Sequence, residues 1–433
     1  MTALTESRLL RIGGLASGFA IGQGSMFVAQ SWLVASNHTA PLGEIGLGLA
    51  ILSLAQWTAD WGGTLLLARH AATDDSSGYI RGAIVCRLCL TPIILAATFL
   101  FVLRYTDAPL VRGLILGGCA SIVLWAVNLT GYLDGKGKNA LSGSVSGLSW
   151  FAASLGLLGA AHGTFAAGLL VGLCYSAGVL ATVVIQYAIA LHYGMGVGFT
   201  APTKADIRRF AKEGTLICSA DLPAQIYGRL IIMMVAAYVG AEATGVYVYI
   251  RQIVVGATQA INFLIRVEFP YVVRYILEGS ARIIGIVRLQ RWSIGSSVLI
   301  FVVTALSAIL LRDFAPPSFQ KIVQLLPYFS LLIPAGTVSL IFGQSVVAND
   351  AVKRYSIVML CTIAGSLTFM CLTMGKMGVP SIFVSEILMY SVQTLSYGAI
   401  LKAALASSHN NPGTSKKSHA KSDSLSTLVA EQA

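Results

Sequence analysis

Residues 164–190, TFAAGLLVGLCYSAGVLATVVIQYAIA, decide the class of fold because this stretch contains no charged side chain. A helix of that length rises roughly 40 Å, which exceeds the hydrocarbon core of a bilayer, about 30 Å thick. Inside lipid every backbone N–H and C=O must be paired within the protein, which a helix does by itself. The run does not alternate between apolar and polar residues as barrel strands do. It therefore predicts a transmembrane helix.

Similar runs recur along almost the whole chain of 433 residues. They are residues 10–35, 44–68, 82–103, 110–133, 139–160, 164–190, 214–239, 245–270, 292–311, 322–348, 356–375 and 379–401. Apolar residues make up 56% of the chain and charged residues only 11%, against roughly 25% charged in soluble domains. The composition predicts an all-α polytopic membrane protein of about twelve transmembrane helices. The first run is too long for a signal-peptide core, and we interpret it as a retained helix.

The basic residues give this bundle an orientation. Lys and Arg concentrate in cytoplasmic segments of membrane proteins. With the N-terminus inside, twenty of the 29 Lys and Arg residues fall on the cytoplasmic side and five on the opposite side. We therefore expect a bacterial inner-membrane protein with both termini in the cytoplasm. The net charge of +11 needs no nucleic-acid partner, since charges that set topology and face the lipid surface explain it.

The spans divide into two sets of six. We predict an N-terminal lobe (1–200), a C-terminal lobe (201–405) and a disordered cytoplasmic tail (406–433), with the lobes in parallel orientation around a central cavity. Residues 191–213 form a long connection at the midpoint and include the basic amphipathic stretch 204–212, which is expected to lie along the membrane surface. External connections are short, so no external domain is predicted.

Catalytic and metal-binding motifs are missing from the sequence. The seven cysteines all fall in apolar spans, and Cys86 and Cys89 have the spacing of a metal-ligand pair without a second pair or a histidine cluster. We interpret them as buried free thiols. No phosphate-binding loop, dinucleotide-binding glycine run or nucleophile elbow occurs. The sequence predicts no catalytic residue, no metal and no organic cofactor.

Polar residues inside the spans are the candidates for function, because each costs about 2.5–3.5 kcal/mol unless it faces a cavity or a partner. Arginine suits phosphate, since its planar guanidinium donates two parallel hydrogen bonds and stays charged. Arg251, Asn262 and Arg266 share one face of the eighth span. The candidate substrate-binding residues are Arg229, Arg251, Arg87, Arg266, Asn262 and Gln225.

Three acids are candidates for carrying a coupling ion, H⁺ or Na⁺, because the chain has no nucleotide site to supply the driving energy. They are Asp60, Asp221 and Glu386. An alternative for these charges is that they pair with one another, for instance Asp221 with Arg229 or Asp60 with Arg87. Arg266 and Glu268 have the further alternative of extending to the cytoplasmic interface. The sequence leaves these alternatives open.

Several of these segments resemble a known family. Gly240-Ala-Glu-Ala-Thr-Gly-Val-Tyr and Phe269-Pro-Tyr-Val-Val-Arg are similar to the turn and the Phe-Pro of the oligosaccharide (Wzx-type) flippases. Those flippases belong to the superfamily of multidrug extruders (MATE proteins) and the peptidoglycan-lipid flippase. Asp60-Trp-Gly-Gly-Thr-Leu-Leu-Leu-Ala-Arg-His resembles the family's Asp-aromatic-Gly segment. Tyr227-Gly-Arg-Leu-Ile departs from the pattern, because many members carry an Asn and an Asp there and this chain has Arg229 without them.

The resemblance implies a MATE-like fold and a transported lipid-linked oligosaccharide, a glycan on undecaprenyl pyrophosphate. It implies flipping from the cytoplasmic to the periplasmic leaflet by alternating access, as part of exopolysaccharide biosynthesis. The implied partners are membrane lipid, a polysaccharide polymerase, and chain-length or export proteins. Two alternatives remain: an ion-coupled multidrug or metabolite antiporter of the same fold, and a membrane polysaccharide polymerase or ligase. The clustered arginines favour an anionic substrate, and the short loops disfavour the enzyme.

Overall fold

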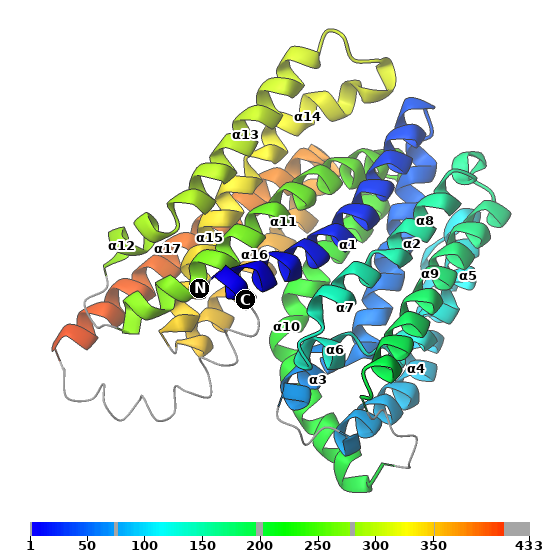
Figure 1. Cartoon of the computed structure of the whole chain (residues 1–433). Helices are drawn as coiled ribbons and strands as arrows, with labels where there is room; N and C mark the ends of the chain where they lie inside the picture. The colour runs from blue at the N-terminus through cyan, green and yellow to red at the C-terminus, as the bar shows by residue number, and fades with distance from the viewer. Residues whose placement is uncertain (1, 73–76, 196–201, 278–281, 350, 411–433) are drawn as a thin grey trace. The chain divides into compact units, whose positions relative to one another are not determined.

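The protein is described here from a computed structural model, shown in Figure 1. It describes all residues except 1, 73–76, 196–201, 278–281, 350 and 411–433, and of some others the backbone alone. The described residues form helices and no strand. Each of the twelve predicted spans coincides with one helix or with consecutive helices, which confirms the all-α membrane fold. Seven stretches of the described chain are long and apolar enough to cross a membrane.

The chain divides into two compact units, residues 1–249 and 250–433. Unit 1 contains α1 (Thr2–Ala35), α2 (Thr39–Asp60), α3 (Gly63–Ala72), α4 (Ser77–Tyr105), α5 (Pro109–Ala126), α6 (Thr130–Gly135), α7 (Asn139–Ser146), α8 (Leu148–Leu157), α9 (Phe165–His192), α10 (Lys204–Tyr238) and the start of α11 (Ala241–Leu277). The backbone of α11 continues across the boundary between the units. The predicted division at residue 200 into six-helix lobes stays a prediction.

Unit 2 contains the rest of α11 and the helices that follow it. These are α12 (Ile283–Leu289), α13 (Arg291–Leu311), α14 (Gln320–Ser330), α15 (Leu332–Ala348), α16 (Val352–Met377) and α17 (Pro380–Asn410). Isoleucines of α11, α12 and α15 pack with Tyr397 and Leu401 of α17 in its core. Helix α17 ends at Asn410, inside the segment 406–433 for which the sequence predicts a disordered tail; residues 411–433 lie outside the described part.

Glycines allow two helices of unit 1 to approach closely. Gly113 and Gly117 of α5 lie against the backbone of α9, and Gly168 and Gly172 of α9 lie against the backbone of α5. A Cβ atom at Gly117 would come within 2.5 Å of the Leu169 carbonyl oxygen. Helices in lipid associate mainly through such close packing, because burying apolar surface gives little advantage there. The α5–α9 pair is therefore a rigid part of unit 1.

Two spans of unit 1 are interrupted. The span predicted at 44–68 breaks between α2 and α3, where Trp61 and Gly62 have left-handed backbone angles (φ 51° and 72°). The side chain of Asp60 accepts a hydrogen bond from the Thr64 N–H (2.9 Å) and so begins α3. The span predicted at 110–133 breaks between α5 and α6, next to Asn128. Each break leaves carbonyl groups at a helix end that need other partners.

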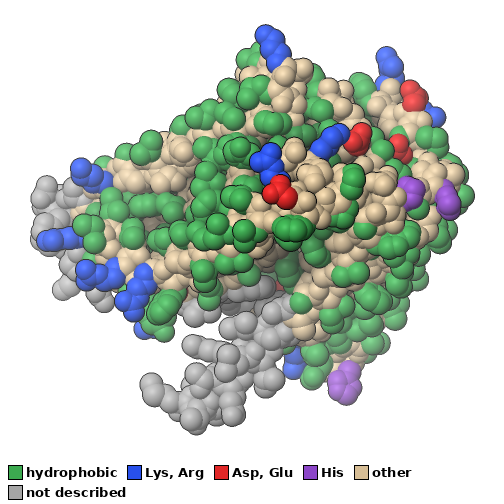
Figure 2. Space-filling model, turned by 90° about the horizontal axis from the view of Figure 1, so that it is seen from above, with side chains coloured by type: hydrophobic (Ala, Val, Ile, Leu, Met, Phe, Trp, Pro, Cys, Tyr) green, Lys and Arg blue, Asp and Glu red, His purple; other side chains and the backbone are tan. Residues whose placement is uncertain are grey.

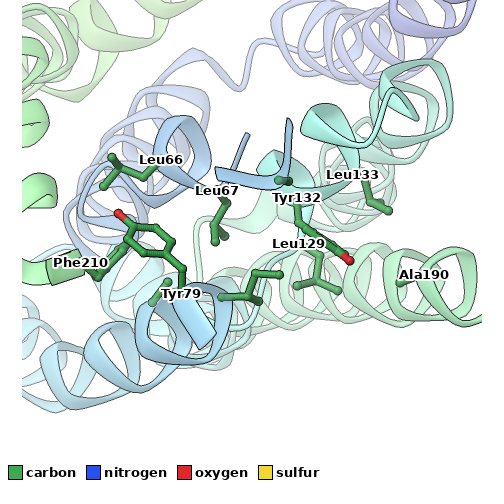
Figure 3. Packing of buried hydrophobic residues seen from close by; sticks show 11 residues of the cluster. Leu66, Leu67, Tyr79, Leu129, Tyr132, Leu133, Ala190 and Phe210 are labelled. Carbon is green, nitrogen blue, oxygen red and sulfur yellow. The ribbon is translucent and has the colours of Figure 1, made fainter. Parts of the chain in front are cut away.

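The core of one end of unit 1 includes a residue from beyond the midpoint of the chain. Leu66, Leu67, Tyr79 and Leu129 pack with Phe210, which is fully buried (Figure 3). Phe210 belongs to the basic stretch 204–212, which forms the first turns of α10 and continues into the span. The stretch is therefore continuous with the seventh span and completes this core through Phe210, while its expected place along the membrane surface stays a prediction.

The surface of the molecule fits a lipid environment. On the face seen in Figure 2, hydrophobic side chains dominate and charged side chains are few. Many large apolar side chains of α4, α9 and α13 are exposed, among them Leu100, Leu173 and Leu310. In water such exposure would favour aggregation, whereas in a bilayer these side chains meet acyl chains.

Candidate functional site

Arg251 and Glu386 form an ion pair within unit 2. Arg251 lies on α11 and Glu386 on α17, and their Nη1 and Oε1 atoms are 3.8 Å apart. The Arg251 side chain is 28% exposed, whereas that of Glu386 is 7% exposed. The Arg251 side chain is therefore partly exposed, whereas the Glu386 side chain that it faces is buried. The pair brings together a predicted substrate-binding residue and a predicted ion carrier.

The other predicted residues of the eighth span lie further along α11. Asn262 is half-buried and its Nδ2 lies 3.4 Å from Oε1 of Gln259, while its own Oδ1 is buried and accepts no hydrogen bond from any described residue. Arg266 belongs to α11, but its side chain lies outside the described part. An unfilled buried acceptor is costly, so Asn262 has capacity for a donor from a ligand or a water.

Arg229 and Gln225 lie one turn apart on α10 in unit 1. Nη1 of Arg229 donates to the backbone carbonyl oxygen of Gln225 and lies 3.4 Å from its Oε1. The Arg229 charge also acts on the buried phenol of Tyr175. Asp221 precedes them on α10, and its side chain lies outside the described residues, so the alternative of pairing with Arg229 stays open.

Arg87 is fully buried at the two helix breaks of unit 1. Its Nη2 lies 2.8 Å from Oδ1 of Asp60, its Nε donates to the Asp60 carbonyl oxygen (3.1 Å), and its Nη1 donates to the Asn128 carbonyl oxygen (3.2 Å). One guanidinium thus donates to a carbonyl oxygen at each of the two helix breaks and neutralises the Asp60 carboxylate. The pairing of Asp60 with Arg87, which the sequence left open, is formed. A side chain at Gly63 would overlap this guanidinium.

Sequence reasoning missed a polar cluster at the same end of unit 1. His70, Tyr79 and Arg209 all contact the carboxylate of Glu213, and these four residues are called the Glu213 cluster below. The sequence contained an indication of this cluster, since His70 ends the motif that starts at Asp60 and Glu213 directly precedes the seventh span. Both were passed over because they lie outside the apolar runs.

A second polar set, centred on Gln56, ties three spans together inside unit 1. Gln56 Nε2 donates to Ser121 (2.9 Å), and Tyr175 donates to Gln56 Oε1 (2.7 Å). Interhelical hydrogen bonds of this kind are worth roughly 0.6–2 kcal/mol in membranes. They join α2, α5 and α9 and use both polar atoms of Gln56 in contacts between helices.

The geometry groups the predicted residues by unit. Arg87 with Asp60 and Arg229 with Gln225 belong to unit 1, and Arg251 with Glu386 belongs to unit 2. No cluster of three or more His, Cys, Asp or Glu residues that could hold a metal occurs among the residues described. What the arrangement offers chemically is charged hydrogen-bond donors for an anion, with acids beside them.

The architecture is shared with solved membrane transporters. It is similar to a structure of the lipid II flippase MurJ in an inward closed conformation, with TM-score 0.60 and 13% identity over 95% of this chain and 90% of that one. It is also similar to an outward-facing MATE multidrug transporter of the MOP superfamily, with TM-score 0.58 and 12% identity over 92% of this chain and 96% of that one. At such identities the likeness shows the fold alone, a multi-pass bundle of helices of the kind these two proteins have.

The family is shown by sequence. Residues 39–276, more than half of the chain, match the family described as polysaccharide biosynthesis protein, and the chain belongs to that family. The resemblance seen in the motifs around Asp60 and residues 240–274 is thereby confirmed. No curated protein matches the chain. The roles predicted for individual site residues stay predictions.

Proposed function

We propose that this protein moves a lipid-linked oligosaccharide, carried on undecaprenyl pyrophosphate, from the cytoplasmic to the periplasmic leaflet of a bacterial inner membrane. Membership of the polysaccharide biosynthesis family and a fold shared with a lipid II flippase support a membrane flippase. The pyrophosphate group explains why the spans carry arginines. The excess of basic residues in alternate connections supports cytoplasmic termini.

The Arg251–Glu386 pair carries the proposal. At 3.8 Å the two groups attract each other without the short contact of a close ion pair, and the Arg251 side chain is partly exposed. A phosphate oxygen offers Arg251 shorter, bidentate hydrogen bonds than Glu386 does. Substrate binding would draw Arg251 away and leave Glu386 without its counter-charge. A buried carboxylate in that state binds H⁺ or Na⁺, which would link transport to an ion gradient.

Arg229 and Gln225 provide a second place for the anionic head group or the glycan. Gln225 orients the guanidinium through the contacts described above, and a glutamine amide can also hydrogen-bond a sugar hydroxyl. Arg266, Asn262 and Asp221 remain proposed members of the substrate and ion path. Arg87 and Asp60 satisfy each other in the core of unit 1, and we propose that they hold that unit together instead of contacting substrate.

Arg251→Ala provides the test, in cells that depend on this protein for surface polysaccharide. We expect surface polymer to fall at least tenfold and lipid-linked oligosaccharide to accumulate in the cytoplasmic leaflet. Arg104→Ala is the matched control, because Arg104 is an exposed arginine at the end of α4. Normal polymer in the Arg251 variant contradicts the role of Arg251. Normal polymer combined with changed drug sensitivity favours the antiporter alternative.

A further inference from the structure

The Glu213 cluster places three hydrogen-bond donors on one carboxylate. Tyr79 Oη donates to Glu213 Oε2 (2.9 Å), His70 Nε2 lies 2.9 Å from the same oxygen, and Arg209 Nε donates to Oε1 (3.2 Å). The side chain of His70 is 10% exposed and that of Glu213 is 30% exposed. These contacts join the start of α10 to α3 and α4, which are neighbours in the sequence but far from α10: Tyr79 and Glu213 are 134 residues apart.

Aromatic contacts fix the geometry of the cluster. The His70 and Tyr79 ring centroids lie 3.7 Å apart, and the Tyr79 ring meets that of Phe210 at an edge (5.8 Å). The Arg209 guanidinium lies 5.5 Å from the centre of the Tyr79 ring. Because Phe210 is itself in the core, His70 is held against Glu213 by packing and cannot swing away freely.

One face of α10 carries this attachment. Asp206, Phe210, Glu213 and Gly214 follow one another at helical spacing. Gly78 and Gly82 of α4 lie against Asp206, and Gly214 lies against Trp61 at the α2–α3 break. The attachment therefore fastens the first turns of α10 to the part of unit 1 that contains both helix breaks.

The charges that face the cluster come from all three elements. Arg69 on α3 acts on Tyr79 together with Arg209 of the cluster. Arg81 on α4 and Arg209 act on Asp206, two turns before Glu213 on α10. Burial would raise the pKa of Glu213, but hydrogen bonds from His70, Tyr79 and Arg209 outweigh burial and lower that pKa. Glu213 is therefore a carboxylate throughout the neutral range. Histidine is the side chain that changes charge between about pH 5 and 8.

We propose that His70, held on Glu213, is a proton-binding site that fastens α10 to α3 and α4 and couples the transport cycle to pH. One proton added to the neutral imidazole gives an imidazolium that keeps its hydrogen bond to Glu213 and gains a charge attraction. Loss of that proton removes the charge attraction but keeps the hydrogen bond between His70 and Glu213. The attachment of α10 is then weaker. The coupling to transport rests on the proposed function, whereas the proton binding does not.

Hydrogen–deuterium exchange of the full-length protein in lipid nanodiscs, without substrate, tests the proton site. After correction for the intrinsic pH dependence of exchange, we expect protection of residues 204–214 to fall about three- to tenfold between pH 5.5 and 8. Residues 165–192 of α9 serve as the internal reference. Equal protection of residues 204–214 at both pH values would overturn the proposal.

His70→Gln separates the proton from the hydrogen bond, because glutamine can still donate to Glu213 but cannot become charged. We expect this variant to show no pH-dependent change in residues 204–214. His192→Gln, at the end of α9, is the control and should behave as the wild type. If His70→Gln retains the wild-type pH dependence, another group binds the proton and the proposal fails. If it does not fold, equal protection of the wild type at the two pH values still overturns the proposal.

Polysaccharide production then tests the coupling. We expect His70→Gln to reduce polymer output and to flatten its dependence on cytoplasmic pH, with His192→Gln unchanged. A pH-dependent attachment together with a normal polymer profile in His70→Gln would show that the proton site exists but does not drive transport. Failure of the Arg251 test with an intact exchange result would contradict the substrate and leave the proton site standing.

Discussion

The guanidinium of Arg87 lies 2.8 Å from the carboxylate of Asp60, and the Arg87 side chain has no exposed surface. Arg87 also donates hydrogen bonds to the carbonyl oxygens of Asp60 and Asn128, one in each interrupted span. One side chain therefore pairs with two helix ends and one carboxylate. A charge buried in this way is tolerable only while its partners are in place.

Removing the Arg87 side chain should therefore destabilise unit 1 strongly. For Arg87→Met we expect unit 1 to lose about 3–5 kcal/mol of stability, because the Asp60 carboxylate and two carbonyl groups lose their partner. Thermal unfolding in detergent or nanodiscs measures the change. The double variant Asp60→Asn/Arg87→Met should be less destabilised than the sum of its single variants. Strict additivity would mean that the two groups do not interact energetically.

The close approach of α5 and α9 makes a second prediction. Gly172→Val should destabilise the protein by about 1–3 kcal/mol or more, since the added side chain overlaps the backbone of α5 at Leu114. Gly365→Ala on α16 is the matched control, because nothing lies within 4 Å of a Cβ atom there. That variant should be neutral or slightly stabilising. Melting temperatures of the two variants in the same lipid give the comparison.

Glu213 predicts a loss of stability in acid. Because the pKa of Glu213 is lowered in the folded protein, its contribution is complete above the ordinary value of 4.5 and is lost as pH falls through the lower folded value. Glu213→Gln should therefore be less stable than the wild type at pH 7, and the difference should shrink below about pH 4. Unfolding curves between pH 3 and 7 measure it. A constant difference across that range would contradict the prediction.

Arg251→Lys tests whether charge alone is sufficient at the proposed substrate site. Lysine keeps the positive charge but lacks the planar, bidentate donor. We expect polymer output between those of the wild type and Arg251→Ala, with about a tenfold loss of apparent substrate affinity. Polymer production measured at several cellular levels of the lipid-linked precursor separates the apparent affinity from the turnover rate. Equal polymer output of Arg251→Lys and the wild type would show that the site needs a positive charge but not the bidentate hydrogen bonds of arginine.

The spans and the fold could be predicted from the sequence because lipid leaves the backbone few choices. Arg251 and Glu386 were recognised as costly intramembrane charges, and the structure pairs them. What the sequence could not give was which acid meets which base, since Arg87 reaches Asp60 only because α2 breaks at Trp61. The attachment of Phe210 and Glu213 to α3 and α4 was also hidden, because the basic residues around them are typical of a surface helix.

The packing of helix α10 limits where the chain can be divided. The predicted boundary between the two lobes would place a cut at residue 200, yet Phe210, Glu213 and Gly214 from beyond that cut pack against α2, α3 and α4 of unit 1. A fragment ending at residue 200 would expose the pocket that Phe210 fills and leave His70 and Tyr79 without their carboxylate. A segment that keeps this core intact must therefore extend past residue 200 into α10.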